Sequence, residues 1–425
     1  MTMLLLFGSL LILILLSVPI GIAIGIASML TILVSDTINM TMLITRLFSS
    51  LDSFPLLAIP FFMFAGLLMG RGGISKRILT LANQLVGWMV GGLAMVTIVA
   101  CTFFAALSGS GPATVAAIGS FMIPEMKKKQ YDPGFASALT AAAGSIGVLI
   151  PPSIPLILYG VISGTSIGEL FKAGILPGLL IGVVLMVFSY IAIKKDGTIV
   201  TEKTDYSFKT LLRSIYDAKW ALLAPVIIIG GIYGGFFTPT EAAVIAIVYA
   251  FLIGTFVHKD LKWQEINESL TETIHLTGAT MYMIGTSIAF AYLLSTEQIP
   301  MKIANMITSL TSNEIIIILL INLFLLLVGA FVDTIPALAM LTPILLPITT
   351  AIGVDPIHFG VIMVMNLALG FITPPFGVNL YIASSVGQTP IEKMFKSMVP
   401  IILFMIAALL IVTYVPTISL LFTNE

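Results

Sequence analysis

The chain has 425 residues, of which 58% are hydrophobic and only 9% are charged, and its formal net charge is -1. An average soluble domain is about a quarter charged, so this composition predicts a polytopic membrane protein whose main solvent is lipid. The near-neutral charge leaves no basic face for nucleic acid, and the single cysteine, Cys101, excludes an intramolecular disulfide and a cysteine metal cluster.

Long apolar segments, taken in chain order, predict the membrane spans. A helix needs about 20 apolar residues to cross a hydrocarbon core about 30 Å thick. The first apolar run has no basic leader and no clear cleavage site, and it continues past Pro19, so we interpret it as a retained first span. The predicted spans cover residues 4–34, 55–69, 135–163, 170–193, 220–235, 241–257, 274–294, 356–384 and 399–421.

Two further apolar blocks, residues 91–126 and 314–350, are interrupted in the middle. Glycine, proline and small polar residues break a helix, because they favour turns or remove a backbone donor. We therefore expect each block to form a re-entrant helical hairpin, which enters and leaves the membrane on the same side. The interruptions are Ser108-Gly109-Ser110-Gly111-Pro112 and Asp333-Thr334-Ile335-Pro336.

The distribution of lysine and arginine predicts which loops face the cytoplasm. Basic clusters all fall on one side when the spans between them are counted, and that side is expected to be cytoplasmic. This places the N-terminus in the cytoplasm and the C-terminus in the periplasm, and the two hairpins enter from opposite faces. The clusters are Arg71/Lys76/Arg77, 127–129, 194–219, Lys259/Lys262 and Lys393/Lys396, and the opposite loops lie around Asp36, 164–169, 238–241, 295–298 and Asp355.

An internal repeat follows the two hairpin blocks. A Pro-Pro pair removes two backbone donors and frees carbonyls upstream, and in hydrocarbon those groups need protein, water or an ion as partners. Chance similarity explains a bare Pro-Pro pair, but the matching glycine, the nearby tyrosine and the preceding hairpin favour a true repeat. The copies are Gly147-Val148-Leu149-Ile150-Pro151-Pro152 with Leu158-Tyr159, and Gly370-Phe371-Ile372-Thr373-Pro374-Pro375 with Leu380-Tyr381.

These features predict a single membrane unit, residues 1–425, with two inverted halves. Residues 91–163 supply the first hairpin and broken helix, residues 314–384 supply the second, and the remaining spans form a scaffold. Secondary transporters hold substrate and coupling ions at such broken helices near the midplane. Free carbonyls suit a cation and helix N-termini suit an anion, so the pattern predicts a cation-coupled anion carrier.

Other function classes fit the residues less well. A hydrolase needs a nucleophile beside a base, but the histidines, at positions 258, 275 and 358, lie near span ends and far in sequence from Ser110. An ATP-driven pump needs a phosphate-binding loop, and no Gly-Lys-Ser/Thr sequence is present. A channel also uses broken helices, yet inverted hairpins without a visible filter repeat favour a carrier.

At five motifs the chain resembles the large membrane subunit of tripartite ATP-independent periplasmic (TRAP) transporters, the DctM-like family. The resemblance extends over essentially the whole chain. The matching stretches are SFPLLAIPFF at 53–62, SGSGPAT at 108–114, PPSIP at 151–155, YGGFFTPTEAA at 233–243 and TPPFGVNL at 373–380.

The resemblance implies an all-α elevator-type carrier in the bacterial inner membrane, driven by a sodium gradient and without a cofactor. It also implies a small membrane subunit and a periplasmic binding protein that delivers an organic acid of the sialic acid or dicarboxylate class. Because no four-helix module precedes the first span, we expect the small subunit on a separate chain. The alternative is a one-component sodium-coupled dicarboxylate carrier, which needs no binding protein.

By the same resemblance, a first sodium site uses Ser108 and Ser110 with backbone carbonyls around Gly147, Ile150 and Pro152. The competing interpretation is that the two serines only allow close helix packing. A position at a glycine-rich hairpin tip favours coordination.

A second sodium site is expected at Asp333 and Thr334 with Gly370 and Thr373. An intramembrane carboxylate is costly unless it is paired or coordinated, although Asp333 also suits the cap of a helix. Thr373 takes the place of Ile150 in the repeat, so the two sites differ chemically.

Four polar residues beside the breaks are candidates for hydrogen bonds to a substrate carboxylate or hydroxyl. Helix capping is an equally good account of most of them. No arginine lies in the predicted core, so we expect anion binding through backbone donors, hydroxyls and bound sodium. Glu241 fits a capped helix start, a structural role. The candidates are Ser110, Thr114, Ser153 and Asn379.

Overall fold

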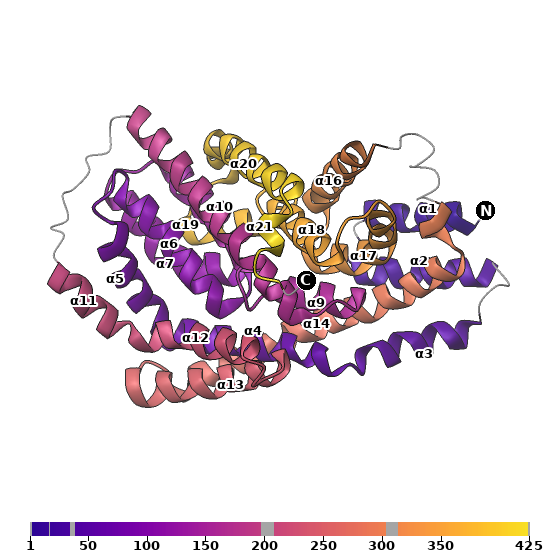
Figure 1. Ribbon diagram of the computed structural model, residues 1–425, viewed down its shortest axis with the longest axis horizontal. Coiled ribbons are helices and arrows are strands. Elements are labelled where there is room, and N and C mark those ends of the chain that lie inside the picture. The colour runs from indigo at the N-terminus through magenta and orange to yellow at the C-terminus, as the bar shows by residue number, and fades with distance from the viewer. Residues whose placement is uncertain (1, 17, 35–38, 197–207, 303–312, 424–425) are drawn as a thin grey trace.

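The structure is a computed structural model that describes residues 2–16, 18–34, 39–196, 208–302 and 313–423 (Figure 1). The expected loop around Asp36 and the middle of the segment 194–219 lie outside these ranges. All regular elements in the described ranges are helical, and seven of the helices are long and apolar enough to cross a membrane. The number is eight if the bent helix pair Phe208–Asp217 and Lys219–Tyr233 is one span. The expectation of an all-α membrane protein is therefore confirmed.

Helices of the first half run from the N-terminus to the end of a 30-residue helix. They are α1 (Thr2–Leu15), α2 (Ile20–Val34), α3 (Met40–Leu51), η1 (Phe54–Leu57), α4 (Ala58–Arg71), α5 (Ile74–Val86), α6 (Gly92–Ser108), α7 (Gly111–Lys128), α8 (Pro133–Gly144), η2 (Ser145–Val148), α9 (Ile154–Ser163) and α10 (Ile167–Asp196).

Helices of the second half include the longest one of the described chain, α14, with 34 residues. They are α11 (Phe208–Asp217), α12 (Lys219–Tyr233), α13 (Pro239–Leu252), η3 (Ile253–His258), α14 (Trp263–Thr296), α16 (Glu314–Phe331), α17 (Thr334–Ala351), α18 (Pro356–Gly370), α19 (Val378–Gly387), α20 (Ile391–Tyr414) and α21 (Thr417–Leu420).

The prediction of one span over residues 4–34 is wrong, because the segment forms two helices, α1 and α2, that pack against each other (Figure 1). Pro19 stands at the break, where it has no N–H to continue a helix. Two helices that pack along each other through so short a connection run antiparallel, so Thr2 and Val34 lie at the same end. The cytoplasmic N-terminus was inferred from a single span and loses that support.

Two amphipathic helices, α3 and α5, were not predicted. In α5 the buried residues Ile74, Ile78 and Leu81 recur at helical spacing and leave the opposite side polar. A search for uninterrupted apolar runs passes over such helices. For the same reason the predicted span at residue 274 starts too late, because α14 begins at Trp263 and its first turns are polar.

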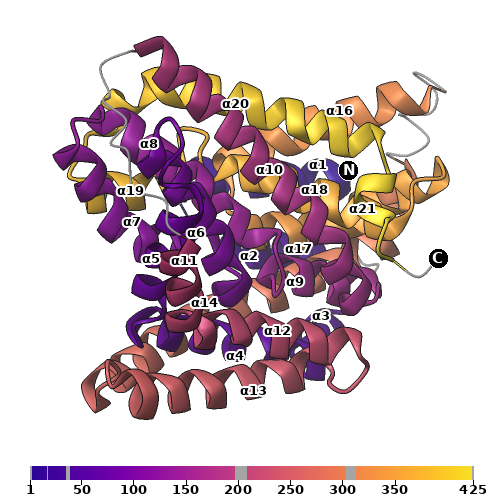
Figure 2. The ribbon, with the colours of Figure 1, turned by 60° about the vertical axis from the view of Figure 1, so that its left-hand side comes forward.

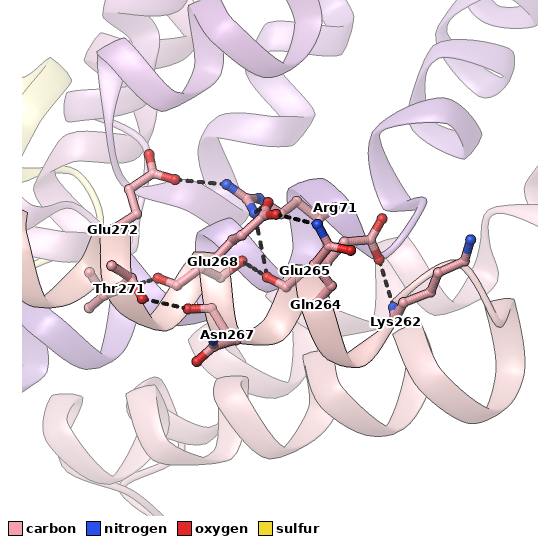
Figure 3. A network of polar contacts seen from close by, with 10 residues as sticks. Arg71, Lys262, Gln264, Glu265, Asn267, Glu268, Thr271 and Glu272 are labelled. Atoms are coloured by element: carbon pink, nitrogen blue, oxygen red, sulfur yellow. Dashed lines mark hydrogen bonds and ion pairs between the residues drawn. The ribbon is translucent and has the colours of Figure 1, made fainter.

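The polar start of α14 is joined to the end of α4 by an ion-pair cluster (Figure 3). Arg71 donates to Glu268 at 2.7 Å and to Glu272 at 2.9 Å, because carboxylates four residues apart lie on one face of a helix. All three side chains are partly exposed, so each pair stabilises the fold by less than about 1 kcal/mol. The cluster links the last residue of α4 to the first turns of α14.

The broken helices occupy the centre of the molecule. Helices α12 and α13 lie along one edge and α20 along the opposite edge, while α10 runs obliquely from the side of α20 toward the middle, as Figure 2 shows. Between these edges, η2 and the whole of α18 after Pro356 are buried. Glu241 forms a capping box with Thr238 at the start of α13, which confirms its structural role.

Candidate functional site

The first predicted hairpin is present as two helices, α6 and α7, that pack against each other and meet at a tight turn. Gly109 has φ +60°, a left-handed conformation that favours glycine. A Cβ at this position would overlap the carbonyl oxygen of Pro152. The Gly109 carbonyl also accepts a hydrogen bond from the Ile154 N–H at 3.3 Å, so the tip of the hairpin rests on the first helix break.

Three hydroxyl side chains converge at this tip. The Ser108 and Thr114 hydroxyls are 2.9 Å apart, and Thr114 Oγ1 donates to the Ser110 carbonyl at 2.8 Å. The Ser110 side chain accepts a bond from the Ala113 N–H at 3.4 Å and so caps α7. Ser108, Ser110 and Thr114 are therefore close neighbours, and a helix cap accounts for one of the Ser110 contacts.

Gly147 and Pro152 lie against the same tip. A Cβ at Gly147 would lie 2.7 Å from the Ser110 carbonyl oxygen and 2.8 Å from Thr114 Oγ1. The expected first-site residues Ser108, Ser110, Gly147 and Pro152 thus come together. The side chain of Ile150 turns away toward α10, where it packs against Gly178.

Ser153 forms hydrogen bonds to the main chain on both sides of the first break. Its hydroxyl donates to the Val148 carbonyl at 2.5 Å and accepts the Leu156 N–H at 3.3 Å, and the residue is fully buried. Capping of α9 therefore uses the donor and an acceptor position of this side chain, which leaves one lone pair for a ligand.

The second break lies against the end of α16. A Cβ at Gly370 would overlap the Gly329 carbonyl oxygen, and the Phe376 N–H donates to the Ala330 carbonyl at 3.1 Å. Thr373 Oγ1 donates to Leu369 O at 2.7 Å within its own helix turn. The Gly329 carbonyl was not predicted, and the sequence signal for it is only a glycine one turn before Asp333.

Asp333 and Thr334 follow at the start of α17. Asp333 accepts the Thr334 N–H at 2.6 Å as the cap of that helix. Thr334 Oγ1 is buried without a protein partner. Among the contacts of the described residues, none joins these two side chains directly to Gly370 or Thr373.

The second helix pair is more open than the first. Helix α16 packs along α18, whereas α17 packs against α14 and α9, and the two point in different directions (Figure 1). A break at Val332 and Asp333 is present as predicted, but the two arms do not form a close pair.

The two halves meet at Asn379. Its Nδ2 donates to the Ala141 carbonyl at 3.1 Å and to Ser145 Oγ at 3.3 Å, while its Oδ1 is buried without a protein partner. Gly111, at the first tip, packs against both Asn379 and the Phe371 ring. Sequence reasoning missed Ser145, whose only signal is its place two residues before Gly147.

The two broken helices run in opposite directions. Tyr159, in α9, donates its hydroxyl to the carbonyl of Pro356, the first residue of α18, at 2.7 Å. At the other end, Gly387 at the end of α19 lies against Ser137 near the start of α8, where a Cβ at Gly387 would lie 2.6 Å from Ser137 Oγ. The Pro-Pro bond is cis in both breaks. In each break a main-chain N–H donates to a carbonyl of the preceding helix pair, from Ile154 to Gly109 and from Phe376 to Ala330. Antiparallel broken helices that share a buried polar centre define an inverted-repeat membrane transporter.

Comparison with known proteins identifies the family within this class of membrane transporters. The family model of the tripartite ATP-independent periplasmic transporter, DctM component, matches residues 7–418. The chain belongs to this family, as its motifs predicted.

Several curated relatives support the assignment. The isethionate TRAP transporter permease protein DctMQ of Oleidesulfovibrio alaskensis is 47% identical over 99% of this chain, which spans 66% of that protein. The C4-dicarboxylate TRAP transporter large permease protein DctM of Pseudomonas aeruginosa is 41% identical, with 93% and 92% of the two chains covered. The sialic acid TRAP transporter large permease protein SiaM of Vibrio cholerae is 38% identical, with 95% and 94% covered. All three are named as permeases.

A solved structure shows the same fold. The Alcanivorax borkumensis YdaH transporter superposes with a TM-score of 0.64 over 88% of this chain and 87% of that chain. The sequence identity is 14%, so the similarity concerns the architecture.

Proposed function

We propose that this chain is the large membrane subunit of a TRAP transporter that imports an organic acid with a sodium gradient. The observation that carries the proposal is the meeting of the two antiparallel breaks at Asn379, which contacts the first half through Ala141 and Ser145. A polar centre shared by two inverted halves is where secondary transporters bind substrate.

The substrate is an organic anion that the site recognises without a basic side chain. The neighbours at the meeting point, Ser110, Gly111, Ser145 and Asn379, are uncharged. Hydrogen-bond donors do not change the charge of the acid group, so bound sodium neutralises it. Both N–H groups of Asn379 are donated to Ala141 and Ser145, which leaves its Oδ1 for a hydroxyl or a cation, while the Ser110 hydroxyl serves as a donor. The named relatives handle a C4-dicarboxylate, a sialic acid and isethionate, which are all organic acids.

Two sodium sites support the coupling. Sodium is a hard cation that takes oxygen ligands, as calcium does. The first site is proposed at Ser108 and Ser110 with the carbonyls around Gly147, Ile150 and Pro152. The hydroxyls of Ser108 and Thr114 and the carbonyl of Ser110 lie together there.

The second sodium site is proposed at Asp333, Thr334, Gly370 and Thr373, with the Gly329 carbonyl added. The unpartnered Thr334 Oγ1 and the main-chain oxygen beside Gly370 supply suitable oxygens. Asp333 contributes the negative charge of this site.

Transport is proposed to follow an elevator motion. The first hairpin, the helices α16 and α17 and the two broken helices move together past a scaffold made of the remaining spans and the small subunit. In the bacterial inner membrane the basic clusters face the cytoplasm and the C-terminus faces the periplasm. With α1 and α2 antiparallel, Thr2 shares the periplasmic end with Val34.

A separate small membrane subunit and a periplasmic binding protein complete the proposed system. The test is uptake of labelled organic acids, isethionate, dicarboxylates and sialic acids included, by proteoliposomes that hold all three components. We expect uptake that requires both the sodium gradient and the binding protein. Uptake without the binding protein would support the one-component carrier, and uptake indifferent to sodium would contradict the coupling.

A further inference from the structure

A row of buried polar side chains crosses the second half outside the proposed binding sites. Asn366 Nδ2 donates to Asn322 Oδ1 at 2.7 Å, and Asn322 Nδ2 donates to Thr413 Oγ1 at 3.1 Å. The ring of His358 lies 3.2 Å from the Thr413 carbonyl oxygen and 3.1 Å from Ser419 Oγ. All five residues are buried, and together they connect α16, α18, α20 and α21, which lie close to one another (Figure 2).

The outer end of the row opens into a cavity of about 350 Å³. His358 and Thr413 line it, together with the carboxylates of Glu314 and Asp355. The lining residues in the described part of the chain include no lysine or arginine. A concave surface that carries only negative charge attracts cations and concentrates them locally.

The inner end of the row approaches the second helix break. Asn366 precedes Gly370 by one helical turn, about 6 Å along the axis of α18. Asn322 precedes Gly329 by two turns on α16, and Gly329 and Gly370 are in contact. The row therefore extends from the acidic cavity to within one turn of the second proposed sodium site.

Helix packing alone does not require an amide at Asn366. In the first half, the residue four positions before Gly147 is Ala143, which is fully buried in α8. The Oδ1 atom of Asn366 has no protein partner although the residue is fully buried. A buried carbonyl oxygen without a partner is unfavourable, and water or a cation relieves the cost.

We propose that this row is a hydrated path by which sodium ions from the periplasmic side reach the second helix break. The proposal rests on the proposed sodium coupling and on the predicted orientation of the acidic cavity. Carboxylates at the mouth attract the ion, and hydroxyl, carbonyl and amide oxygens along the row replace part of its hydration shell. A dry interhelical hydrogen-bond network is the competing account.

Accessibility to silver ions tests the path. Asn366→Cys and Thr413→Cys are introduced separately into a Cys101→Ala chain, and Val364→Cys, which is equally buried on α18, serves as the control. Cells that contain the whole transporter receive Ag⁺ in chloride-free medium from the outside. The fraction of thiol protected from maleimide is then measured after denaturation.

We expect the two thiols on the row to react on the order of tenfold faster than Val364→Cys, because a hydrated cysteine forms the reactive thiolate more readily. External sodium should slow this reaction. Equal rates at all three positions, or reaction only from the cytoplasmic side, would overturn the path. Sodium-driven uptake by the unmodified transporter is measured separately, so loss of the path and loss of sodium coupling give different results. Because Thr413 already lines the cavity, Asn322→Cys, which lies on the row but outside the cavity lining, keeps the comparison valid if Asn366→Cys does not fold.

Discussion

Gly147 and Gly370 place the main chain of each broken helix directly against a hairpin carbonyl. The oxygens concerned belong to Ser110 and Gly329, and neither approach leaves room for a Cβ atom. Two inverted halves use the same device, which explains why the glycine recurs at the same offset from the Pro-Pro pair.

Alanine at either glycine should therefore separate a hairpin from its break. We expect Gly147→Ala and Gly370→Ala each to abolish most uptake and to destabilise the protein by about 1–3 kcal/mol, the usual cost of overpacking. Thermal unfolding of the purified protein and proteoliposome uptake measure the two effects. Gly278→Ala is the control, because nothing lies within 4 Å of its Cβ position, and it should be neutral or slightly stabilising. Full uptake by Gly147→Ala would contradict the close contact.

Asp333 has two roles that a single substitution can separate. Asparagine caps a helix about as well as aspartate but carries no charge. We expect Asp333→Asn to change the unfolding free energy by less than about 0.5 kcal/mol, the range of substitutions that keep their local interactions. The sodium concentration for half-maximal uptake should rise severalfold. If the sodium dependence of uptake is unchanged, Asp333 does not bind sodium and its role is to cap α17.

The residues that lie together near the breaks were predictable where the signal is local, while their roles as ligands stay predictions. Ser108, Ser110 and Gly147 follow from motif and offset, and the structure brings them together. The pairing of Asn379 with Ser145 was not predictable, because the two residues are 234 positions apart and each is ordinary in its own helix.

At the scale of elements, the interrupted segments were predicted better than the uninterrupted ones. Proline and glycine mark the breaks of α8/η2/α9 and α18/α19 within a few residues. The amphipathic helices α3 and α5 were not found because polar residues alternate with their apolar residues at helical spacing. The different directions of α16 and α17 depend on tertiary packing against α18 and α14, which no local pattern encodes.

Lys127 ties the first hairpin to the second broken helix, since its ammonium donates to the Gly387 carbonyl at the end of α19. A cation at a helix C-terminus is favourable, so we expect Lys127→Met to lower the unfolding free energy by about 1–2 kcal/mol. Lys128→Met is the matched control, because Lys128 forms only an exposed pair with Glu125 and should change stability by less than about 1 kcal/mol. Thermal unfolding distinguishes the two. Equal effects would show that the contact across the halves contributes nothing.

At the scale of the whole molecule, the elevator proposal predicts which helices can be joined without harm. A Cβ at Gly70 of α4 would lie 3.6 Å from the Phe104 ring of α6, across the boundary between scaffold and first hairpin. In a Cys101→Ala chain, a short reducible crosslink between Gly70→Cys and Phe104→Cys should stop uptake, and reduction should restore it. Gly119→Cys with Thr140→Cys joins α7 to α8 inside the moving group and should leave uptake intact. Transport through the first crosslink would exclude the motion.

The antiparallel course of the two broken helices has a consequence for the origin of the chain. Each half supplies one glycine contact and one Pro-Pro break, and the polar centre at Asn379 forms where the two halves meet. A protein of half this length, with so weak a charge bias that it inserted in both orientations, would assemble the same centre as a dimer of opposed copies. Fusion of two such genes would then allow the halves to diverge, as Ile150 and Thr373 have done at equivalent positions.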